Sequence, residues 1–200
     1  ETQFDNLGDA LINRELISLI SGHAEVTIGL SRVPSRFQEK IGYDFLSQYT
    51  LDKKRGRSRF LLKILFKALA GRSCYLFLSP GGWIGEIDGR LNLRSWFHTL
   101  IYYVLSLFGV KICQLGGSYE DLGPMLSLLL RARSRALYCH YVRDSDSENV
   151  MKSLNVKVDG ICPDLALNGF EKQRPSSNPD GVTFSFRSDQ YPDQIDDIKR

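Results

Sequence analysis

The chain has 200 residues, of which 42% are hydrophobic and 24% are charged, and its formal net charge is +3. This composition is that of a globular protein and excludes an intrinsically disordered chain, while the small net charge gives no overall signature of a nucleic-acid-binding protein. The length fits one large domain or one and a half small ones.

Residues 3–12 predict a tight loop that opens a helix. Gly8 permits backbone angles that are closed to other residues, and Asp9 is a suitable N-cap for the helix. Apolar residues then recur at helical spacing from Leu11 to Ile20. In an α/β domain, the N-terminus of such a helix points into the cleft where ligands bind.

Predicted strands and helices alternate along the rest of the chain. The predicted strands cover residues 23–30, 73–78, 110–115, 136–142, and 156–158 with 160–162. The predicted helices cover residues 35–47, 59–70, 93–109, 125–133 and 145–154, and residues 49–56 are expected to be a polar connection. This alternation predicts an α/β fold in which a Rossmann-like parallel sheet carries helices on both faces.

Glycine and polar residues follow the predicted strands, at the edge where parallel sheets carry their ligands. They are Gly81, Gly82, Gly116, Ser118, Arg143, Asp144 and Asp164. The glycines are explained equally well by sharp turns and by a close approach of the backbone to a ligand. An arginine suits the recognition of an anion, although Arg143 could instead pair with Asp144 or Asp146 at the start of the next helix.

Basic residues gather between positions 53 and 72, where there is no acidic residue. They are Lys53, Lys54, Arg55, Arg57, Arg59, Lys63, Lys67 and Arg72. The segment has the pattern of a helix that lies on an anionic membrane surface, and also that of an ordinary amphipathic helix with a solvated basic face. Residues 93–109 are too short and too interrupted by Arg94 and His98 for a membrane span, so we expect a buried core helix there.

The four cysteines are far apart in the sequence and predict buried thiols in a reducing compartment. The first residues carry no signal-peptide pattern, so we expect a cytoplasmic location. Residues 1–170 are expected to form one domain, residues 171–181 a linker, and residues 182–200 the start of a second, truncated domain.

Several motifs, taken in this order, resemble the polysaccharide pyruvyl transferase family. They are Asn6-x-Gly8-Asp9, the strand into Gly81-Gly82, Gly116-Gly117-Ser118 with Gly123-Pro124, Arg143-Asp144-x-x-Ser147, Pro163-Asp164-x-Ala166, and the strand into Phe186-Arg187. The resemblance implies transfer of the enolpyruvyl unit of phosphoenolpyruvate onto two hydroxyls of a sugar, or of a lipid-linked oligosaccharide, in cell-surface polysaccharide biosynthesis. It also implies two Rossmann-like domains in a glycosyltransferase-B-like arrangement, of which this chain is the amino-terminal half.

Several residues are candidates for roles in this reaction. Asp9 and His98 are the catalytic candidates, although capping explains Asp9, and a structural role explains His98 and His140. The substrate-binding candidates are Asn6, Gly8, Gly81, Gly82, Gly116, Ser118, Arg143, Asp144, Ser147 and Asp164. A structural role that ties down the following linker is an alternative for Asp164.

We expect no cofactor, no metal and no nucleic acid, with phosphoenolpyruvate as the donor substrate. Two other functions fit the same pattern. One is a glycosyltransferase that uses a nucleotide sugar in the same cleft, and the other is a catalytically inactive module that binds a sugar or a membrane.

Overall fold

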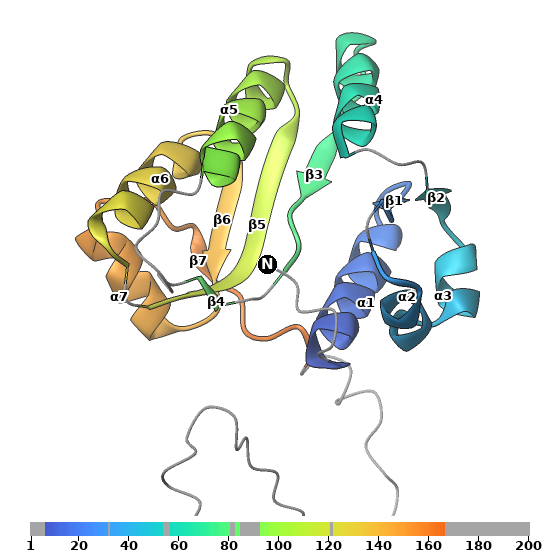
Figure 1. The fold of residues 1–200 in the computed structure, drawn as a ribbon, viewed down its shortest axis with the longest axis horizontal. Helices are drawn as coiled ribbons and strands as arrows, with labels where there is room; N and C mark the ends of the chain where they lie inside the picture. The colour runs from blue at the N-terminus through green and yellow to red at the C-terminus, as the bar shows by residue number, and fades with distance from the viewer. Residues whose placement is uncertain are drawn as a thin grey trace, which may run out of the picture.

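The computed structural model describes residues 7–31, 33–53, 57–80, 83–84, 93–120 and 122–166. The predictions for Asn6, Gly81 and Gly82, for the linker at 171–181 and for the second domain at 182–200 fall outside these residues. Within them, parallel strands are flanked by helices, which confirms the predicted α/β, Rossmann-like class (Figure 1).

The main sheet is parallel and follows the order β3-β5-β6-β7 (Figure 1). Its strands are β3 (Tyr75–Phe77), β5 (Lys111–Tyr119), β6 (Cys139–Val142) and β7 (Gly160–Ile161), and the short β4 (Trp83–Ile84) pairs with the far end of β5. The strands are connected by α5 (Leu93–Leu107), α6 (Pro124–Ser134) and α7 (Ser145–Ser153). Because all pairings are parallel, the carboxyl ends of β3, β5, β6 and β7 meet at one edge.

A second, two-stranded parallel sheet joins β1 (Thr27–Gly29) and β2 (Thr50–Asp52). It lies beside α1 (Leu7–Ser21), α2 (Ser35–Ile41) and α3 (Tyr43–Ser47) (Figure 1). The prediction of a plain polar connection at 49–56 is therefore wrong, because β2 lies within it. The single helix predicted at 35–47 is also wrong, since it breaks at Gly42, whose φ of 103° only glycine adopts without strain.

One core cluster holds α4 (Arg57–Leu69) and α5 against the strands of the main sheet. Its buried residues are Leu61, Leu76, Tyr102, Leu105, Val110, Ile112 and Ala136. The two helices lie close to their predicted positions, but the expectation that the second is a buried core helix is wrong, because α5 buries only one of its faces. β3 is the outermost described strand on its side of the main sheet, and this position leaves Tyr75 47% exposed.

β5 is longer than predicted. The Gly116-Gly117-Ser118 segment was expected to be the turn that ends it, yet the strand continues to Tyr119. The pairing of β5 with β6 shifts register between Gln114 and Gly117, and Gly116 sits in this bulge with φ of 63°. This bulge is the physical reason why the strand continues. It accommodates an extra residue with left-handed backbone angles, which glycine adopts without strain because it has no Cβ.

Tyr119 and His140 form a buried polar pair between β5 and β6. The Tyr119 hydroxyl lies 2.9 Å from His140 Nε2, and His140 Nδ1 lies 3.3 Å from the carbonyl oxygen of Lys157. The Asp159 carboxylate accepts the His140 backbone N–H at 2.8 Å. His140 is 4% exposed, so its ring has a structural role in the core.

Burial makes folding stability depend on the protonation of His140. Burial lowers the pKa of His140 below its usual value of 6.5, because the charged ring loses its hydration. An unfolded chain binds this proton more readily, so the stabilisation that the neutral His140 ring gives to the folded state is complete above pH 6.5. This stabilisation is lost as the pH falls through 6.5 toward the pKa of His140 in the folded state. We expect the free energy of unfolding in urea to fall over this range by at most about 1.4 kcal/mol per pH unit for this one proton.

The matched variants are His140→Gln and His23→Gln, since His23 is exposed. Urea titrations from pH 8 to pH 5.5 should show a weaker acid dependence in His140→Gln and an unchanged one in His23→Gln. Equal acid slopes in all three proteins would contradict the assignment to His140.

Candidate functional site

A narrow pocket lies at the carboxyl edge of the main sheet. It is lined by Ile12, Pro80, Gly116, Arg143, Pro163, Asp164 and Leu165. These residues come from α1, the bulge of β5 and the segments that follow β3, β6 and β7. Three predicted substrate-binding residues, Gly116, Arg143 and Asp164, are therefore brought together from positions far apart in the sequence.

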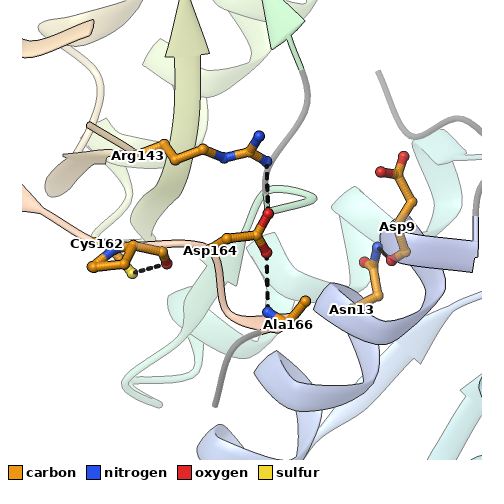
Figure 2. Close-up of polar contacts among 7 residues, drawn as sticks. Asp9, Asn13, Arg143, Cys162, Asp164 and Ala166 are labelled. Atoms are coloured by element: carbon orange, nitrogen blue, oxygen red, sulfur yellow. Dashed lines mark hydrogen bonds and ion pairs between the residues drawn. The ribbon is translucent and has the colours of Figure 1, made fainter. Parts of the chain in front are cut away.

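Arg143 is the cation of this pocket. Its backbone N–H donates to the carbonyl of Gly117 at 3.0 Å, so the bulged strand fixes the start of its side chain. Its Nη2 lies 3.6 Å from Asp164 Oδ2, and both side chains are about 30% exposed (Figure 2). The Nε atom is buried and has no hydrogen-bond partner among the described residues. A buried unpaired donor is costly, so this nitrogen is an unsatisfied N–H donor at the pocket.

Asp164 holds both the guanidinium and the chain that leaves β7. Its Oδ1 accepts the backbone N–H of Ala166 at 3.0 Å, and its Oδ2 faces Arg143 (Figure 2). The ion pair of Arg143 is therefore with Asp164, which corrects the alternative of Asp144 or Asp146. At 3.6 Å and with both groups partly solvated, the pair is weak and leaves the guanidinium able to bind a ligand.

α1 forms the other side of the pocket through Ile12. The helix already includes Leu7 and Gly8, so Asp9 is its third residue and the prediction that Asp9 is the N-cap is wrong. Asp9 is 8% exposed, and its backbone carbonyl accepts the Asn13 side-chain amide at 2.7 Å. Figure 2 shows Asp9 and Asn13 on α1, across from Arg143 and Asp164. Asp9 and Ile12 are three residues apart and share one face of the helix.

Three further predicted substrate-binding residues, Asp144, Ser147 and Ser118, contact other parts of the protein itself. Asp144 is the N-cap of α7, and its Oδ1 accepts the Ser147 N–H at 2.7 Å. The Ser147 hydroxyl accepts the Tyr119 N–H at 3.0 Å and is 2% exposed. Ser118 is 8% exposed and is paired in register with Trp83 of β4. The Arg-Asp-x-x-Ser motif thus joins the end of β5 to the start of α7, directly after Arg143.

We expect Asp144→Ala to lower the free energy of unfolding by about 1 kcal/mol, the usual cost of a lost N-cap. For a chain of this size this corresponds to a fall in Tm of roughly 2–4 °C. Asp146→Ala is the matched control, because Asp146 is exposed in the first turn of α7 and the cap at Asp144 remains. A thermal melt that ranks Asp146→Ala as the more damaging change would contradict the capping role.

The pocket does not include His98. This residue is half-buried on α5, and the described residues that line the pocket include none from that helix. No cluster of three His, Cys, Asp or Glu side chains suited to a metal ion occurs in the described part of the chain. The four cysteines are free thiols, and burial raises the pKa of Cys113 to about 12, which keeps its thiol protonated and unreactive.

Four residues that line the pocket were not predicted as site residues from the sequence. Pro80 and Pro163 directly precede the predicted Gly81 and Asp164, so the strand-end rule could have included them. Ile12 and Leu165 carry no such signal, because an apolar residue at helical spacing or in a connection has the same pattern whether it packs in a core or lines a pocket.

No curated protein and no solved structure matches the chain significantly. The family model described as polysaccharide pyruvyl transferase matches residues 6–199, nearly the whole length, and includes every residue of the pocket. The chain belongs to the polysaccharide pyruvyl transferase family.

Proposed function

We propose that this protein transfers the enolpyruvyl unit of phosphoenolpyruvate onto two hydroxyls of a sugar, forming a pyruvate ketal during polysaccharide synthesis. The observation that carries the proposal is Arg143, whose buried Nε has no partner among the described residues in a pocket at the carboxyl edge of a parallel sheet. The membership of the family supplies the transferase class and the polysaccharide acceptor. Phosphoenolpyruvate carries a carboxylate and a phosphate, both of which suit a guanidinium.

The proposed reaction balances without a cofactor. The methylene carbon of the donor gains a proton, which leaves positive charge on the adjacent carbon, and the first sugar hydroxyl forms a C–O bond there. The C–O bond to phosphate then breaks, and the second hydroxyl closes the ketal on the same carbon. Of the two protons that the hydroxyls lose, one balances the new methyl group and the other leaves with inorganic phosphate.

Three residues of the pocket, together with Asp9 on α1, have proposed roles in this reaction. Arg143 binds the carboxylate or phosphate of the donor, and Asp164 holds the guanidinium in place. The backbone of Gly116, which carries no side chain, allows the donor to approach β5 closely. Asp9 orients a sugar hydroxyl from α1, a role supported by its position one turn before Ile12.

The remaining predicted residues have supporting roles in the proposal. Gly8 lets the first turn of α1 approach the ligand, while Asp144, Ser147 and Ser118 fix the strand ends around Arg143. The proposal includes Asn6, Gly81 and Gly82 as binding residues on the strength of their motifs alone. We assign no step to His98, because α5 contributes none of the described residues that line the pocket.

The decisive experiment incubates the full chain with phosphoenolpyruvate and a panel of sugar and lipid-linked acceptors. We expect phosphate release that requires an acceptor and a product whose added carboxylate is lost in mild acid. A thermal-shift measurement with phosphoenolpyruvate and with uridine diphosphate separates donor classes, because a ligand that binds only the folded chain raises its Tm. Stabilisation by uridine diphosphate alone, with no release of phosphate, would overturn the proposal.

A further inference from the structure

The outer face of α5 carries an apolar stripe that is exposed to solvent. Its residues are Leu93, Phe97, Leu100, Val104 and Leu107. The exposed fractions reach 82% at Leu107 and 61% at Phe97, while the opposite face, with Tyr102 and Leu105, is buried in the core. A helix that is apolar on both faces is usual inside a protein or in contact with lipid, and it is costly in water.

α4 carries a second exposed apolar patch. Leu62, Phe66 and Leu69 are each about half exposed or more, and they are spaced four and three residues apart. α4 and α5 pack against one shared core cluster, through Leu61 on α4 and Leu105 on α5. Figure 1 shows the two helices beside the main sheet, with β3 and β5 between and beneath them.

The exposed charged side chains that the structure describes on α4 and directly after it are positive. Arg59, Lys67 and Arg72 are exposed on and after α4. Neither α4 nor α5 contains an acidic residue, and the sequence has none from 53 to 85 or from 89 to 119. Lys63 differs from these three residues, because its ammonium forms an ion pair with the buried Asp52. Charge complementarity therefore favours an anionic partner for this surface.

Exposed aliphatic and aromatic side chains bordered by arginine and lysine are the pattern of helices that lie in the headgroup region of a membrane. No helix in the described part of the chain is long and apolar enough to cross a bilayer. We propose that the outer faces of α4 and α5 together dock this protein on an anionic lipid surface. Phe66, Phe97, Leu100 and Leu107 enter the headgroup boundary, while Arg59, Lys67 and Arg72 contact the lipid phosphates.

The docking surface differs from the basic segment at 53–72 that the sequence suggests. That segment supplies charge, but the deeper apolar contact comes from α5, which begins 21 residues after the segment ends. Docking does not depend on the proposed reaction, so a protein that fails to transfer pyruvate can still bind lipid through these helices.

The test is co-sedimentation of the full chain with vesicles of phosphatidylcholine alone and of phosphatidylcholine with 30 mol% phosphatidylglycerol. We expect binding to the anionic vesicles that weakens as salt is raised, and little binding to the neutral ones. Phe97→Glu with Leu100→Glu should reduce the bound fraction at least tenfold, and Arg59→Glu with Lys67→Glu should remove its salt-dependent part.

Leu19→Glu with Tyr43→Glu is the matched control, because it adds two carboxylates at exposed apolar positions on α1 and α3. This control should bind like the unmodified protein, and thermal melts confirm which variants are folded. Equal binding of the α5 variant and this control would overturn the proposal, as would a lack of binding to anionic vesicles. Light scattering that shows a dimer dispersed by Phe97→Glu with Leu100→Glu would assign the surface to a second copy and overturn it as well.

Discussion

Arg143→Lys is expected to lower kcat/KM for ketal formation by about 100-fold, and Arg143→Ala by more. The guanidinium offers several N–H donors in a fixed plane, whereas lysine offers a single ammonium that cannot replace the buried Nε. Loss of charge-assisted hydrogen bonds to an anionic donor costs about 3 kcal/mol, which corresponds to a factor of roughly 100 in rate. Steady-state kinetics with varied phosphoenolpyruvate measure this loss.

Two further variants separate a role in ligand binding from a purely structural ion pair. Asp164→Asn removes the charge that faces Arg143 and keeps an oxygen for the Ala166 N–H, so we expect only a few-fold loss of activity. Arg131→Lys, at an exposed position on α6, should leave activity unchanged. Equal losses in Arg143→Lys and Asp164→Asn would show that the arginine acts only through its carboxylate partner.

Ligand binding can be followed apart from turnover. Phosphoenolpyruvate should raise the Tm of the unmodified chain and of Arg131→Lys, because it binds the folded state. The same concentration should have a much smaller effect on Arg143→Ala. If phosphoenolpyruvate stabilises Arg143→Ala as strongly as the unmodified chain, then the anion binds elsewhere, and the role proposed for this pocket is wrong.

The long elements of the fold were predictable because their apolar spacing is sustained over several turns. The helix expected at 59–70 is observed as α4 (Arg57–Leu69), and the helix expected at 93–109 as α5 (Leu93–Leu107). β2 was not predicted, because a three-residue strand with Leu51 as its one apolar side chain has no measurable period. Periodicity also cannot show that α5 leaves a second apolar face in solvent, since exposure depends on which elements surround a helix.

The site was predictable as far as strand order and residue chemistry allow. The rule that ligands bind at the carboxyl ends of parallel strands selected Gly116, Arg143 and Asp164, and these three line one pocket. The partner of Arg143 was not predictable, because Asp164 is 21 residues away and reaches it only through the pairing of β6 with β7. The Gly116-Gly117-Ser118 segment was expected to turn, because its residue types favour turns locally. Pairing with β4 and β6, which local chemistry does not show, instead extends it as a strand.

Gly117→Ala is expected to lower both stability and activity, because the added Cβ would lie 3.0 Å from the ring of Tyr119. Tyr119 cannot move aside easily, since its side chain is 2% exposed and its hydroxyl is bound to His140. Crowding of this kind in a core costs about 1–3 kcal/mol, so we expect a fall in Tm of roughly 2–12 °C.

The same substitution should displace Arg143, because the carbonyl of Gly117 accepts the Arg143 backbone N–H. The loss of activity should therefore be larger than the loss expected from the fraction of protein that is unfolded at the assay temperature. Gly22→Ala is the matched control, since its added Cβ would meet only the Leu19 carbonyl oxygen at an ordinary 3.7 Å. Thermal melts and kinetics on both variants measure the two effects. A Gly117→Ala protein with the Tm and activity of Gly22→Ala would show that β5 yields at its bulge and does not fix the arginine.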